Sequence, residues 1–184
     1  SNTIYAGMLG RLHPSGRYLY GAVNNLSPSD IEKFDIRPGV SKALYDSPYH
    51  GDYAMNGNLW FSEDGTRLFA RSGNVFRSSE VKSEDMLYMG SLGGGVQWVA
   101  HSGEASRVFS LAYEHPSHVR VHSDDLFSLR GAEPLPPFPL PGGTADSNGE
   151  YVFVNAAGTQ VYVLVRAGDT QLWGLVVLQV ANMP

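Results

Sequence analysis

Short apolar segments separated by turn residues run along the whole chain. Near the C-terminus, residues 151–154, 160–165 and 172–180 are rich in β-branched and aromatic residues, and glycine-containing turns separate them. These segments do not alternate strictly between apolar and polar residues, which predicts strands that are buried on both faces. No segment of ten or more residues shows a convincing helical period. The pattern therefore predicts an all-β protein.

A phrase consisting of a turn followed by a strand recurs four times. Small polar residues and a glycine precede a charged or polar residue, and an apolar strand follows. The copies are HPSGRYLY (residues 13–20), SEDGTRLF (62–69), HSGEASRVF (101–109) and DSNGEYVF (146–153). When Arg17, Arg67, Arg107 and Glu150 are aligned, the spacings are 50, 40 and 43 residues. A period of this length, with several strands in each repeat, is typical of β-propeller blades.

We therefore predict a β-propeller of about four blades, each a four-stranded antiparallel sheet, in a single domain over residues 1–184. The predicted blades cover residues 9–50, 51–93, 94–142 and 143–181. Three interpretations of the low blade number stay open. The chain is a fragment of a longer propeller, a complete small propeller, or half of a ring that two chains close as a homodimer. The homodimer would form through blade edges at residues 3–8 and 175–180.

The composition excludes several classes of protein. With 42% hydrophobic and 17% charged residues, the chain is globular and not disordered. A net charge of -5 without a lysine or arginine cluster argues against nucleic-acid binding. The absence of cysteine excludes disulfides and cysteine-ligated zinc. No stretch approaches 18 uninterrupted apolar residues, so no membrane span is predicted.

The repeated phrase resembles the core of YVTN-type and lactonase-type seven-bladed propeller repeats, over about residues 9–180. The third copy departs from this core, since residues 103–106 replace its tight Asp-Gly turn, and the Gly-His and Trp-Asp dipeptides of WD40 repeats are missing. The resemblance implies a non-catalytic binding or scaffold module that is bacterial and exported to the periplasm or the cell exterior. The chain begins at Ser1 without a methionine, which fits a processed or truncated protein.

The resemblance also implies an alternative function, the hydrolysis of a sugar lactone. Such an enzyme would need a cluster of histidine, arginine and glutamate at the mouth of the channel. His50, Glu114 and His115 fit this requirement, but no arginine lies in an obvious loop position. Because a fold alone does not determine an activity, the binding module is the preferred interpretation.

The loops on one predicted face carry a polar and aromatic set of residues. The set comprises Asn24, Asn25, Tyr49, His50, Asp52, Tyr53, Ser72, Asn74, Gln97, Glu114, His115 and Asn155. We predict that His50, Asp52, Asn74, Glu114 and His115 bind a protein or small-molecule ligand, since propeller loops commonly carry such sites. Any solvated loop is equally polar, and this alternative stays open. No catalytic residue, metal site or cofactor is predicted.

Three histidines, His115, His118 and His122, have a spacing that invites a metal-site interpretation. On a strand, His118, Arg120 and His122 would share one face. Because the cation of Arg120 would lie between two of the imidazoles, we predict a solvated strand face without a metal.

The proline-rich run PLPPFPLP, residues 134–141, is the most unusual local stretch. Its prolines favour polyproline II, and they match a pattern recognised by SH3-like grooves. We predict a stiff connector between the third and fourth blades, with Leu135, Phe138 and Leu140 packing on the blade edges.

Overall fold

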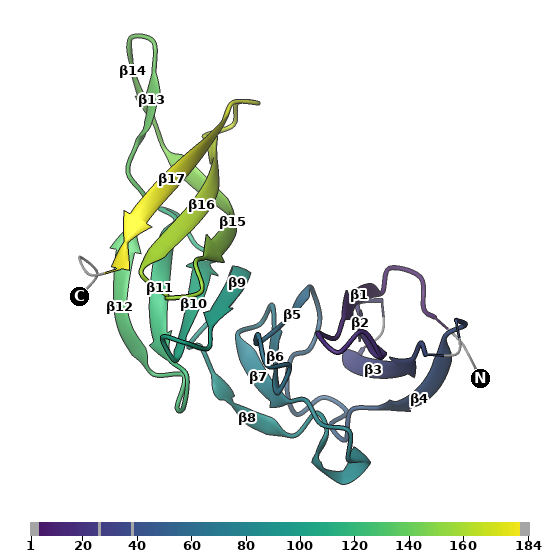
Figure 1. Ribbon diagram of the computed structural model, residues 1–184. Coiled ribbons are helices and arrows are strands. Elements are labelled where there is room, and N and C mark those ends of the chain that lie inside the picture. The colour runs from purple at the N-terminus through teal and green to yellow at the C-terminus, as the bar shows by residue number, and fades with distance from the viewer. Residues whose placement is uncertain (1–3, 26, 38, 181–184) are drawn as a thin grey trace. The chain divides into compact units, whose positions relative to one another are not determined.

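The computed structural model describes residues 4–25, 27–37 and 39–180 (Figure 1). Apart from η1 (Lys82–Glu84), a single 3-10 turn, the regular elements in this part of the chain are all strands. The all-β prediction is therefore confirmed. None of the described helical segments is long and apolar enough to cross a membrane.

The chain divides into two compact units, residues 1–91 and 92–184. The first unit holds two antiparallel sheets in which each strand pairs with the next along the chain. One sheet consists of β1 (Leu9–Leu12), β2 (Tyr18–Val23), β3 (Asp30–Asp35) and β4 (Lys42–Asp46). The other consists of β5 (Leu59–Phe61), β6 (Arg67–Ala70), β7 (Asn74–Arg77) and β8 (Tyr88–Ser91).

The second unit has a four-stranded sheet, a three-stranded sheet and a hairpin. The four strands are β9 (Val96–Ser102), β10 (Arg107–Ala112), β11 (His118–Ser123) and β12 (Leu129–Pro134). The three strands are β15 (Ser147–Val154), β16 (Gln160–Ala167) and β17 (Trp173–Gln179). The hairpin between these sheets pairs β13 (Phe138–Leu140) with β14 (Gly143–Ala145).

Each predicted blade interval contains one of the four larger sheets, and the hairpin of β13 and β14 spans the boundary between the third and fourth intervals. Strands β1–β4 fall within 9–50, β5–β8 within 51–93, β9–β12 within 94–142 and β15–β17 within 143–181. Four-stranded antiparallel sheets are confirmed for the first three intervals, whereas the fourth sheet has three strands among the described residues. The single domain over residues 1–184 stays a prediction.

The recurring turn joins the first two strands of a sheet. In three sheets a glycine in the left-handed region donates its N–H to the carbonyl three residues earlier, over 2.8–2.9 Å. These glycines are Gly16, Gly65 and Gly158, with φ of 69°, 72° and 64°. Glycine has no Cβ to strain this conformation, so its recurrence in the sequence has a steric cause. The third sheet closes the same hairpin with Ser106 at φ 51°, which accounts for its divergent phrase.

The predicted alignment of the fourth phrase is wrong. Residues 146–149 do not form the equivalent turn, because β15 already begins at Ser147 and the turn follows Asn155. Asn148-Gly149 looks like a turn signal, yet Gly149 serves the packing of β15 against the third sheet. A Cβ on Gly149 would lie 2.6 Å from Cδ1 of Leu111. Between Gly65 and Gly158, the recurring turn therefore occurs once without its glycine, at Ser106 in the third sheet.

The proline-rich run does not form the predicted polyproline II connector. Pro134 ends β12, and Phe138–Leu140 forms β13. Proline is tolerated here because Pro139 lies opposite Thr144 in an isolated hairpin, where a missing N–H breaks no continuous ladder. Leu135 and Phe138 do pack on the apolar core of the second unit, as expected.

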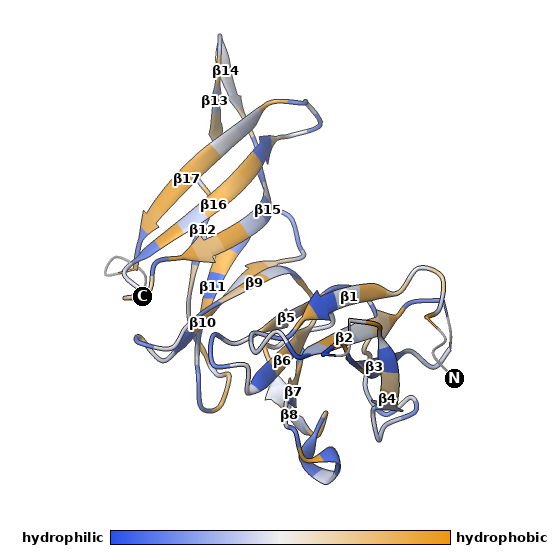
Figure 2. Cartoon of the chain, turned by 45° about the vertical axis from the view of Figure 1, so that its right-hand side comes forward, coloured by the Kyte–Doolittle hydropathy of each residue, from blue (hydrophilic) through white to orange (hydrophobic). Residues whose placement is uncertain are grey.

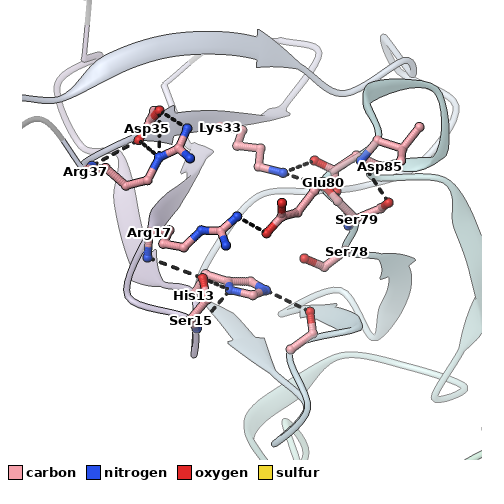
Figure 3. Close-up of polar contacts among 12 residues, drawn as sticks. His13, Ser15, Arg17, Lys33, Asp35, Arg37, Ser78, Ser79, Glu80 and Asp85 are labelled. Carbon is pink, nitrogen blue, oxygen red and sulfur yellow. Dashed lines mark hydrogen bonds and ion pairs between the residues drawn. The ribbon is translucent and has the colours of Figure 1, made fainter.

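A buried ion pair lies at the centre of the first unit. Nζ of Lys33 on β3 is 2.7 Å from Oδ2 of Asp85, and both side chains are almost fully buried (Figure 3). The hydroxyl of Tyr20 donates to Asp85 over 3.0 Å, that of Tyr45 over 3.1 Å, and the N–H of Ser79 over 2.8 Å. Burial and the charge of Asp85 raise the pKa of Tyr20, which keeps its hydroxyl protonated as a donor.

A second buried polar contact lies in the core of the second unit. Nε2 of His122 is 2.8 Å from Oγ of Ser110, and Nδ1 is 3.2 Å from the carbonyl of Phe127. His122 is fully buried, so the predicted solvated face is wrong at this position. The physical reason is that Ser110 on β10 and the carbonyl of Phe127 cover this end of the strand face.

We expect Asp85→Ala to lower the free energy of unfolding by about 3–5 kcal/mol, because Lys33 would remain buried without its counter-ion. Glu80→Ala is the matched control. Its ion pair with Arg17 is largely exposed, and we expect a loss of less than about 1 kcal/mol. Urea unfolding followed by tryptophan fluorescence measures both. Equal losses in the two variants would contradict the central role of Asp85.

We expect stability to fall between pH 6.5 and about 4 because of His122. Burial lowers the pKa of His122 to about 4; the hydrogen bond with the Phe127 carbonyl opposes this shift and the charge of Arg120 adds to it. The unfolded chain, with a pKa near 6.5, therefore takes up the proton first as the pH falls. The contribution is complete above pH 6.5 and is lost by about pH 4, at a cost of about 3 kcal/mol. Urea midpoints measured across this range should depend less on pH in His122→Gln, and an unchanged slope would refute the assignment.

Candidate functional site

The predicted ligand-binding residues fall into two groups, one in each compact unit. His50 and Asp52 lie in the loop between β4 and β5, and Asn74 begins β7. Glu114 and His115 lie in the loop between β10 and β11. Each group has its own geometry.

In the first unit, two of the predicted loop residues hold the β4–β5 loop in place. Nδ2 of Asn74 donates to the carbonyl of Ala54 over 3.1 Å, and the hydroxyl of Ser72 donates to the same oxygen over 2.6 Å. Tyr53 stacks on Tyr88 with ring centres 4.1 Å apart, so this predicted residue belongs to the core. The side chains of Asn74 and Tyr53 therefore have structural roles in the first unit.

His50 joins two carboxylates that the sequence interpretation did not include. Nδ1 of His50 is 3.1 Å from Oδ2 of Asp30, and Asp46 offers a third ligand atom within 4.8 Å of the other two. Burial, followed by the charges of Asp46 and Asp30, raises the pKa of Glu32 beside them. Carboxylates and imidazoles are ligands for divalent cations. This cluster is largely exposed, and exposed acidic groups often lie this close together without an ion, so we assign no metal to it. The predicted residue Asp52 is exposed to solvent.

In the second unit, a groove of about 290 Å³ lies between the ends of β9, β10 and β15. It brings together three residues of the predicted polar set, Gln97, Glu114 and His115. The remaining lining residues are Ala112, Tyr113, Ser117, Asn148, Gly149 and Glu150. The β10–β11 loop and the start of β15 thus form a polar recess within this unit.

The charges around this groove are arranged in pairs. Glu114 forms an ion pair with Arg120, and its Oε1 is 3.1 Å from Nε2 of His118. Glu150 accepts a hydrogen bond from Nε of Arg166 over 3.2 Å, and one from Nε2 of Gln97 over 3.4 Å. The carboxylates that face the groove are therefore largely neutralised, and the surface offers hydrogen-bond donors and acceptors side by side.

The three histidines of the spaced motif do not converge on one point. Nε2 of His115 is 3.2 Å from Oδ2 of Asp146, His118 contacts Glu114, and His122 contacts Ser110 in the core. Their different partners argue against a shared metal ion.

Sequence reasoning missed the residues that β15 contributes to the groove and the arginine of β11 that pairs with Glu114. In the sequence, Asn148 and Glu150 belong to a turn phrase, and Arg120 belongs to a predicted solvated face. Only the register between β15 and the third sheet brings Asn148 and Glu150 to the groove, and no local sequence signal reports that register.

Comparisons with known proteins agree with the sheet architecture. No family model matches the chain, and no curated protein matches it either. Hydrazine synthase from Kuenenia stuttgartiensis is similar with a TM-score of 0.67 and 12% identity, over 95% of this chain and 51% of that one. The β-propeller domain of Cps50 (Swd1) from Myceliophteria thermophila is similar with a TM-score of 0.58 and 13% identity, over 86% of this chain and 47% of that one.

The chain thus spans about half the length of these solved structures. At such low identity, the likeness shows the fold alone. The YVTN-type repeat stays a prediction. The predicted fold class is confirmed: this chain is an all-β protein of the β-propeller type.

Proposed function

We propose that this chain is a non-catalytic binding module of the propeller type, and that it binds a small, uncharged, hydroxyl-rich molecule. The observation that carries this proposal is the groove of about 290 Å³ in the second unit, where Gln97, Glu114 and His115 gather from separate segments. Its size is at the lower end of the range for small-molecule sites.

The chemistry of the lining favours hydroxyl groups. The amides of Gln97 and Asn148 offer donors and acceptors, and the carboxylate of Glu150 accepts hydrogen bonds. Tyr113 is 62% exposed and presents an aromatic ring at the rim. A strongly charged ligand would meet carboxylates and guanidinium groups together, so one of the two would repel it. The hydroxyl groups of a saccharide can donate to the carboxylates and accept from the guanidinium groups without bringing in an uncompensated charge.

The lining residues favour binding over hydrolysis. Arg120 and His118 hold the carboxylate of Glu114, and Arg166 holds that of Glu150, so neither is poised as a free general base. The hydroxyl of Ser117 accepts a hydrogen bond from the N–H of Gly149 over 3.2 Å, and within the described part of the chain no carboxylate or imidazole is hydrogen-bonded to it as an activating base.

We expect at least one of glucose, N-acetylglucosamine and maltose to bind, as measured by saturation-transfer NMR and by calorimetry. Glu150→Ala should weaken that binding about tenfold, because it removes an acceptor worth roughly 1–1.5 kcal/mol. Glu104→Ala, which changes an exposed carboxylate outside the groove, is the control and should leave the affinity unchanged. If none of the three saccharides binds, or both variants behave alike, the proposed ligand class is wrong.

The lactonase alternative has a direct test. We expect glucono-1,5-lactone to hydrolyse no faster with the protein than in buffer, because the groove carboxylates are held in ion pairs. Proton release at constant pH measures the rate. A rate above that of buffer, abolished by Glu114→Gln, would overturn the non-catalytic assignment.

A further inference from the structure

Two sheets pack face to face in the second unit, and their register defines two kinds of face. The face of the third sheet that meets the fourth carries Trp98, Ala100, Phe109, Leu111, Val119 and Val121. We call this the forward face. The face of the fourth sheet that receives it carries Val152, Val161, Val163 and Val165, and we call this the rear face.

The recurring turn shows which positions are equivalent in the two sheets. Ser102 and Arg107 flank the turn in the third sheet, as Asn155 and Gln160 do in the fourth. Counting from these residues, Phe109 corresponds to Tyr162. The other correspondences are Leu111 with Leu164, Ala100 with Phe153, Val121 with Val177, and Val119 with Leu175.

The forward face of the fourth sheet is therefore built like one that another sheet covers, yet it is open. Leu175 is 60% exposed, Phe153 48% and Val177 47%, and Trp173 in the adjacent row is also exposed. Figure 2 shows β16 and β17 as strongly hydrophobic strands. Exposed apolar patches of this kind mark interaction sites.

The first unit follows the same rule. Tyr18, Tyr20 and Ala22 on the forward face of the first sheet pack with Leu59, Leu68 and Ala70 on the rear face of the second. In both units, a forward face meets an apolar rear face, which in the second sheet includes Phe61 and Phe76 beside Leu68.

On the rear face of the first sheet, partly open apolar residues of β1 and β2 lie beside the carboxylates of Glu32 on β3 and Asp46 on β4. Leu12 pairs with Leu19, at the positions of Val154 and Val161 in the fourth sheet, and Leu12 is 54% exposed. Met8 lies over Gly21 on this face, since a Cβ there would meet its Sδ at 2.2 Å. Ile4, which is 54% exposed, adds to the apolar surface of the first unit.

We propose that the open forward face of β15–β17 binds the rear face of β1–β4 in a second copy of this chain. A second copy supplies a rear face, which is the side of a sheet that a forward face meets in both compact units. The contact joins two different surfaces, so it is heterologous. It refines the predicted homodimer, whose edge residue Thr3 lies outside the described residues. This proposal is independent of the ligand groove.

Light scattering during size exclusion, over increasing loading concentrations, tests the proposal. We expect a mass of at least about twice 20.0 kDa for the wild type, because a heterologous contact either closes a ring of two chains or adds further copies. We expect about 20.0 kDa for Leu175→Glu and for Leu12→Glu, each of which damages one face. A mixture of the two variants should recover the doubled mass, because each supplies the face that the other has lost. Leu126→Glu, at an exposed leucine on neither face, is the control and should keep the wild-type mass.

Circular dichroism spectra that match the wild type establish that each variant is folded. A wild-type mass of 20.0 kDa at all concentrations would overturn the proposal. So would a doubled mass in Leu12→Glu alone, since the forward face would then pair with itself.

Discussion

The carboxylate of Asp85 sets the arrangement of the first unit, because it is buried away from water and is stabilised by the hydrogen-bond donors around it. Its hydrogen-bond donors come from β2, β3 and β4 of the first sheet and from the backbone after β7. To present its N–H, Met86 adopts a φ of 56°, a conformation that costs a buried non-glycine residue about 1–2 kcal/mol. The two sheets cannot separate without exposing a charge network that is neutral only as a whole.

The second unit reaches the same packing with fewer polar groups. Its sheets meet through valine, leucine and aromatic side chains, and the contact between Ser110 and His122 lies within one sheet. Polar residues gather instead around the groove, where Arg120 and Arg166 form ion pairs with the lining residues Glu114 and Glu150. The unit thus separates an apolar interior from a polar rim, and the rim is the surface available for recognition.

Much of the fold could be predicted, because turns and strands are local features. Gly16 and Gly65 mark their turns unambiguously, and the apolar runs that follow them form β2 and β6. Gly149 misleads, since a glycine required by close packing resembles one required by a turn. The site was predictable only in part: Glu114 and His115 line the groove, whereas Glu150 joins them through inter-sheet register, which leaves no local sequence signal.

The hairpin of β13 and β14 has more space for changes at its tip than at its base. At its base, the ring of Phe138 fills the space beside Gly174, where a Cβ would be only 2.7 Å away. At its tip, a Cβ added to Gly142 or Gly143 would meet no atom within 4 Å, and both residues are exposed. Changes of chain length are therefore absorbed at the tip and not at the base, which makes the tip a natural point for an affinity tag, a fluorophore or an inserted peptide.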